Sequence, residues 1–75
     1  MATILIIDDD PGILDTLSLM VERMGHQPLT ASRLAQGIAA ARGNEVDVVF
    51  LDVRMPDGSG LDALPDLERA PSSPE

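Results

Sequence analysis

The chain has 75 residues, enough for one small domain, and its hydrophobic share of 44% is typical of a folded protein rather than a disordered one. Its net charge of −8, with no lysine, argues against direct binding of nucleic acid and leads us to expect none by this segment. The absence of cysteine excludes disulfides and thiolate metal sites and fits a cytoplasmic protein, and no apolar run is long enough to span a membrane.

The first predicted elements are a strand and a helix. Residues 3–7 form a short, continuous apolar run, which predicts a buried strand. Asp10 is a suitable N-cap and Pro11 suits the first helical position, so a helix of about four turns is predicted from there to Gly25. Its apolar residues recur at helical spacing and are expected to face the core. They are Ile13, Leu17, Met20 and Met24, flanked by Leu14 and Val21.

A second strand and a second helix are predicted next. Residues 26–30 read as a weak strand, which belongs at a sheet edge because Pro28 has no N–H to donate. Ser32 is predicted to cap a helix that ends at Gly43, and Gly37 weakens that helix by roughly 1 kcal/mol relative to alanine. The lone His26 follows a helix end, which favours a local surface role over catalysis.

The strongest predicted strand covers residues 46–52, followed by a loop over residues 53–60. Within that loop Asp57 precedes a glycine and reads as a turn residue. A third helix should carry three leucines, at positions 61, 64 and 67. Pro65 lies in its interior if the helix starts at Gly60, and in its first turn if it starts near Asp62. We expect one domain over residues 1–70 and a loop or tail over residues 71–75.

Two of the apolar runs stop abruptly on carboxylates. Asp8 and Asp9 follow the first run, and Asp52 follows the third. The order of three strands alternating with three helices predicts an α/β protein with a parallel sheet, in which both runs point the same way. These three side chains would then meet at one edge, where their mutual repulsion calls for a hard divalent cation.

At this point two motifs are recognisable. Ile-Ile-Asp-Asp-Asp-Pro at 6–11 and Phe-Leu-Asp-Val-Arg-Met-Pro-Asp-Gly-Ser-Gly-Leu at 50–61 resemble the receiver domain of two-component response regulators. The resemblance implies a flavodoxin-like (CheY-like) doubly wound parallel sheet, of which this chain carries the first βαβαβα portion. In that fold the first and third strands are neighbours, and the ligand crevice lies at their carboxyl ends.

The resemblance also implies roles for individual residues. Asp52 corresponds to the phosphoacceptor, which takes a phosphoryl group from a histidine kinase. Asp9 corresponds to the direct Mg²⁺ ligand, Asp8 to a ligand acting through bound water, and the backbone carbonyl of Arg54 to a further ligand position. Such a domain is a phosphoacceptor that assists its own phosphorylation rather than a turnover enzyme. Asp10, directly before Pro11, reads as a helix cap instead.

Parts of the family pattern have no counterpart in these residues. A complete receiver has five strands and five helices, with a serine or threonine after the fourth strand and a lysine after the fifth. The third strand is therefore expected to be an exposed, apolar sheet edge, which predicts self-association or packing against the missing half. The stretch at 61–65 resembles sigma-54-dependent transcriptional regulators.

Other functions fit these motifs to different degrees. A non-phosphorylated, receiver-like interaction or dimerisation module is the serious alternative. A phosphatase of the haloacid dehalogenase type would need a carboxylate two residues after its nucleophile, where Arg54 stands. A calcium loop lacks its glycine and distal glutamate at the required spacing, and a dinucleotide fold lacks a glycine-rich turn after the first strand.

Overall fold

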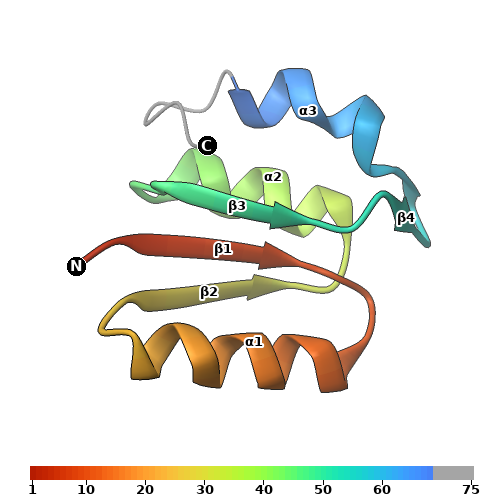
Figure 1. Ribbon diagram of the computed structural model, residues 1–75. Coiled ribbons are helices and arrows are strands. Elements are labelled where there is room, and N and C mark those ends of the chain that lie inside the picture. Colours follow the sequence, from red (N-terminus) through yellow and green to blue (C-terminus); the bar gives the residue numbers. More distant parts are fainter. Residues whose placement is uncertain (69–75) are drawn as a thin grey trace.

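Three parallel strands form the centre of the molecule, with helices on both faces (Figure 1). The computed structural model describes residues 1–68; the expected loop or tail over 71–75 lies outside the described residues. The elements follow one another as β1 (Thr3–Ile7), α1 (Pro11–Arg23), β2 (Gln27–Ala31), α2 (Leu34–Gly43), β3 (Val48–Leu51), β4 (Arg54–Met55), β5 (Gly58–Ser59) and α3 (Gly60–Glu68).

The strand order is β2-β1-β3, and both pairings with the central strand β1 are parallel. Ile7, the last residue of β1, stands opposite Ala31 of β2 and Leu51 of β3. The predicted α/β fold with neighbouring first and third strands is confirmed, and β2 lies at the edge that Pro28 requires. All three strands therefore end at the same edge of the sheet.

Successive residues of β1 are buried on opposite faces, as the period of a strand demands. Ile4 and Ile6 pack on α1, where they contact Val21. Leu5 and Ile7 belong to a separate core cluster with residues of α2 and α3. A Cβ at Gly37 would overlap the side chain of Ile7, so this glycine, which weakens α2 as a helix, lets α2 pack closely on β1.

Helix α1 begins as predicted, because the Asp10 carboxylate accepts a hydrogen bond of 2.8 Å from the Gly12 N–H. The expectation that Met20 and Met24 face the core is wrong: their side chains are 53% and 67% exposed. The helix turns its neighbouring stripe to the sheet instead, with Val21 buried and Leu14 and Leu17 packed beside it.

Helix α2 does not begin as predicted. Ser32 is not its cap: the Ser32 N–H and Oγ both bond the Gln36 side chain, and the N-cap position is taken by Arg33, whose side chain makes no capping bond. The helix starts one residue later than a Ser32 cap would place it, and its first N–H groups find a partner far along the chain, in Asp57.

The third strand and the segment after it also differ in detail from expectation. Strand β3 is shorter than the predicted run over residues 46–52. The loop that follows contains a two-stranded antiparallel hairpin, β4–β5, and α3 starts at Gly60. Pro65 therefore lies inside α3, the first of the two alternatives, and it cannot donate the hydrogen bond that its position in the helix calls for.

Among residues 1–68 no helix combines the length and apolar character needed to cross a bilayer.

Candidate metal centre

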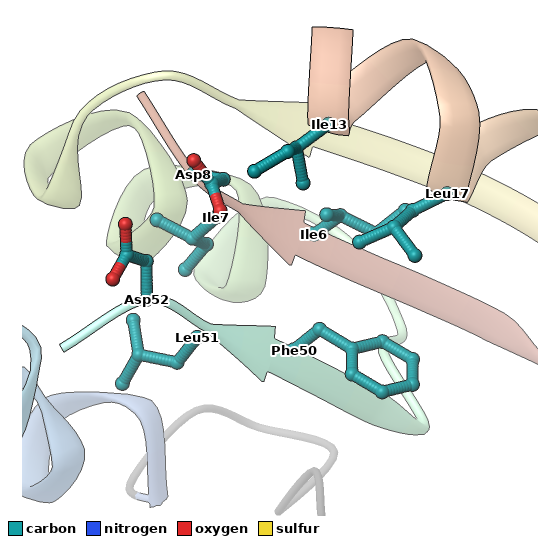
Figure 2. Close-up of a pocket in the computed structure, with 8 residues that line it drawn as sticks. All are labelled: Ile6, Ile7, Asp8, Ile13, Leu17, Phe50, Leu51 and Asp52. Carbon is teal, nitrogen blue, oxygen red and sulfur yellow. The ribbon is translucent and has the colours of Figure 1, made fainter. Parts of the chain in front are cut away.

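Asp8 and Asp52 are held in place by the sheet itself. The Asp8 N–H donates to the Ala31 carbonyl at 3.1 Å, and the Asp52 N–H donates to the Ile7 carbonyl at 3.0 Å. Both bonds continue the parallel ladders one residue beyond the strand ends. Figure 2 shows the two side chains just past the ends of β1 and β3, on the same side of the sheet edge.

Asp9 completes the predicted cluster. One carboxylate oxygen from each of Asp8, Asp9 and Asp52 lies within 4.8 Å of the others. Asp9 is exposed, whereas Asp8 and Asp52 are partly buried. The structure thus brings together the three carboxylates that the sequence singled out.

Backbone N–H groups orient two of these carboxylates. Asp8 Oδ1 accepts from the Asp10 N–H at 2.9 Å, and Asp52 Oδ1 accepts from the Arg54 N–H at 3.1 Å. Each side chain keeps its second oxygen, which makes no hydrogen bond among residues 1–68. One oxygen of each carboxylate therefore fixes the side chain, and the other is available to a ligand.

Among residues 1–68 the acidic cluster has no basic partner. Within the described part of the chain the one ion pair joins Arg42 to Asp66, and no arginine or histidine pairs with Asp8, Asp9 or Asp52. Two unit charges about 4 Å apart repel by about 1 kcal/mol in bulk water and by about 4 kcal/mol near a protein surface. A small divalent cation that prefers oxygen ligands would remove this repulsion, so the donor set fits Mg²⁺.

The backbone of Arg54 lies beside the acidic cluster. Its side chain is exposed, and its N–H donates to Asp52 Oδ1. It begins the hairpin, pairing with Ser59 across β4 and β5. The peptide of Arg54 is thus adjacent to Asp52, and the role of its carbonyl as a ligand stays a prediction.

Gly60 matters to the site more than the sequence indicated. Its N–H donates to the Val53 carbonyl at 2.7 Å. A Cβ here would overlap the Asp52 carbonyl and stand 3.0 Å from the Val53 Cα. The start of α3 can approach the backbone of Asp52 only because residue 60 is glycine. The sequence signal was a glycine at the end of a turn-rich loop, which reveals a special geometry but not the partner.

Three other polar residues lie outside the cluster. Asp10 caps α1, as predicted. Asp57 is in the turn between β4 and β5, as predicted, and it also accepts hydrogen bonds from the N–H groups of Leu34 at 2.9 Å and Ala35 at 3.1 Å. These bonds lower the pKa of Asp57 below its ordinary value. His26 has a local role, since its Nδ1 accepts from the Ala2 N–H.

A cavity of about 380 Å³ opens beside the cluster (Figure 2). At one end it is bounded by Asp8 and Asp52, and elsewhere by apolar side chains of β1, α1 and β3. Its lining residues are Ile6, Ile7, Asp8, Ile13, Leu17, Phe50, Leu51 and Asp52. The acidic edge therefore borders an open apolar surface.

The fold and the acidic strand ends agree with comparison against known families. Residues 4–75 match the family model of the response regulator receiver domain. The chain therefore belongs to this family, and its class is that of a two-component receiver domain.

Two curated relatives illustrate the likeness. Protein PilH of Pseudomonas aeruginosa is 42% identical over 69 residues, which are 92% of this chain and 57% of PilH. The transcriptional regulatory protein KdpE of Mycobacterium tuberculosis is 44% identical over 64 residues, which are 85% of this chain and 28% of KdpE. The chain thus spans little more than half the length of one relative and less than a third of the other.

A solved structure gives the same result for the fold. The response regulator protein TrrA of Thermotoga maritima, determined in complex with Mg²⁺ and BeF, superposes with a TM-score of 0.86 at 29% identity. The match covers 92% of this chain and 60% of TrrA.

Proposed function

We propose that this chain accepts a phosphoryl group on Asp52 from the phosphohistidine of a histidine kinase, with Mg²⁺ held by Asp8, Asp9, Asp52 and the Arg54 carbonyl. The observation that carries the proposal is the meeting of three carboxylate oxygens within 4.8 Å at the ends of β1 and β3. Membership of the receiver family and the Mg²⁺ in the TrrA complex support it.

The chemistry follows from how Asp52 is held. Its Oδ1 is engaged by the Arg54 N–H, which leaves Oδ2 to attack phosphorus. The transfer breaks the P–N bond of the phosphohistidine and forms a P–O bond to Asp52, and the freed imidazole takes up a proton from solvent. Bound Mg²⁺ would supply charge neutralisation at the phosphoryl oxygens.

The product of this step stays on the chain. An acyl phosphate on Asp52 changes the charge at the sheet edge, so the domain acts as a signalling phosphoacceptor rather than a turnover enzyme. A cytoplasmic location and a kinase partner are parts of the same proposal. The strong acidity of the chain, at −8, supports the further expectation that this segment does not itself bind nucleic acid.

The test is the intact mass of the chain before and after incubation with Mg²⁺ and a small acyl-phosphate donor. We expect one phosphoryl adduct that requires Mg²⁺ and is lost in Asp52→Asn. Asp10→Asn is the matched control, because Asp10 lies in the same acidic run but caps α1. An adduct that persists in Asp52→Asn, or no adduct with Mg²⁺ present, would contradict the proposal.

One observation favours a second candidate, a module that associates with copies of itself. Phe50 of β3 is 51% exposed, and among residues 1–68 no strand pairs with the outer edge of β3. An open apolar edge of this kind favours pairing with another chain. Light scattering over a range of protein concentrations should then show a dimer that Phe50→Asp abolishes. A monomer at every concentration would rule this candidate out.

A further inference from the structure

The hairpin β4–β5 connects the acidic cluster to the start of a helix that contributes nothing to the cluster. Its tip carries Asp57, whose two carboxylate oxygens accept from the N–H groups of Leu34 and Ala35, 2.9 and 3.1 Å away. Those N–H groups have no other cap, because the side chain of Arg33 makes no capping bond. The tip of the hairpin is therefore the N-terminal cap of α2.

The hairpin is fixed at three places along its length. At its base, the Gly60 N–H bonds the Val53 carbonyl. In the middle, Met55 is only 8% exposed and belongs to the core shared with α2 and α3. At its tip, Asp57 bonds α2, while Gly58, at a φ of 147°, leaves room for the Leu34 side chain. Of these, only the Asp57 bonds are polar links to another helix.

We propose that Asp57 is a positioning residue for the metal centre. By tying the hairpin tip to α2, it holds the Arg54 peptide against Asp52. This inference rests on the proposed function, since it concerns how Mg²⁺ is held there. Asp57 touches neither the cluster nor a bound ligand, so its effect is indirect.

Asp57 can act on the metal centre because few residues separate the hairpin tip from Asp52 along the chain. Arg54 pairs with Ser59, and Met55 pairs with Gly58, so each arm of the hairpin has two residues. With Asp57 released, the tip loses its polar link to α2, and the arms are held only at the base and by the burial of Met55, so they can shift within these two contacts. The Arg54 N–H would then move relative to Asp52 Oδ1, and the carbonyl of the same peptide would move with it.

The first experiment is a calorimetric titration of the whole chain with Mg²⁺. For Asp57→Ala we expect the dissociation constant to rise about tenfold, the size of effect that outer groups supporting metal ligands produce. Asp62→Asn is the matched control. Asp62 borders the same surface as Asp57 and carries the same charge, but its side chain makes no hydrogen bond or ion pair among the described residues. Its dissociation constant should stay at the wild-type value.

A second variant separates the effect of Asp57 on the position of the Arg54 peptide from its effect on the stability of the fold. In Asp57→Ala, adding Arg33→Ser gives α2 a local cap at the position that Arg33 holds, and it leaves the net charge equal to that of the wild type. We expect the double variant to recover its thermal midpoint but not its Mg²⁺ affinity. Recovery of both would show that Asp57 serves only as a cap and would overturn the inference. The double variant also gives a folded protein to measure if Asp57→Ala alone unfolds.

The inference and the proposed function fail in different ways. If the wild type does not bind Mg²⁺, or binds it unchanged in Asp9→Asn, the acidic cluster is not the metal centre and both fail. If the wild type binds Mg²⁺ and Asp9→Asn abolishes binding, but Asp57→Ala binds as tightly as the wild type, the inference alone is wrong.

Discussion

The two faces of the sheet are packed very differently. Among residues 1–68, nine buried residues form one core cluster on the side of α2 and α3, whereas the buried cluster on the side of α1 has three. Exposed apolar side chains occur on α1 and β3, among them Ile13, Met20 and Phe50, and also on α3, at Leu61 and Leu64. Burial of apolar surface is the main stabilising term, so within the described residues the α2–α3 face supplies most of the stability. The acidic cluster lies at the edge between the two faces.

The largest loss of folding stability is expected when a buried side chain on the α2–α3 face is shortened. Leu5 is 0% exposed and sits at the centre of the α2–α3 cluster. Leu5→Ala is expected to cost about 2–5 kcal/mol, because it removes buried methyl groups and leaves a cavity. Native domains have only about 5–15 kcal/mol to lose, and a small one is near the low end. Urea unfolding followed by circular dichroism measures the loss, and a cost below that range would show a looser core.

A smaller effect is expected where the well-packed face meets the site. In Gly60→Ala the new Cβ overlaps the Asp52 carbonyl, so α3 and Asp52 must move apart, at a cost of about 1–3 kcal/mol. Mg²⁺ affinity should fall with it. Gly43→Ala is the matched control at the end of α2, where a Cβ meets nothing within 4 Å. If both variants unfold at the same urea concentration as the wild type, the close contact between Gly60 and Asp52 does not contribute to stability.

The helices on the two faces also begin differently. Helix α1 is capped by its own neighbour, Asp10, and α2 by the distant Asp57. The pKa of Asp57 is lowered in the folded state from an ordinary value of 3.8, chiefly by the Leu34 N–H. Its stabilising bonds are therefore fully present above pH 3.8 and are lost as the pH falls through the lower, folded-state pKa.

This pH dependence can be measured directly. The stability of the wild type should fall on acidification below pH 3.8, and Asp57→Asn should flatten that part of the profile. Thermal unfolding at a series of pH values tests it, with Asp62→Asn as the control that keeps the wild-type slope. An unchanged slope in Asp57→Asn would mean that the bonds to α2 do not hold in solution.

The two helix caps show which contacts can be predicted from the sequence and which cannot. The cap by Asp10 and the cluster of Asp8, Asp9 and Asp52 follow from local signals: an Asp-Pro pair, and apolar runs that stop on carboxylates. The cap by Asp57 could not be found this way, because its partner Leu34 is 23 positions away. The same limit explains the error at Met20 and Met24: helical spacing identifies an apolar stripe but does not tell what covers it.

The smallest effect should come from the open face, and it sharpens the comparison most directly. Ile6 and Phe50 stand opposite each other on β1 and β3, but Ile6 is 1% exposed and Phe50 is 51% exposed. Phe50→Ala should cost less than about 1 kcal/mol in dilute solution, whereas Ile6→Ala, at a buried position of the same face, should cost more, near the low end of about 2–5 kcal/mol. If the cost of Phe50→Ala rises with protein concentration, a second copy covers this surface and the chain associates through it. If it equals the cost of Ile6→Ala at every concentration, the α1 face is closed within the single chain, and the asymmetry between the faces is wrong.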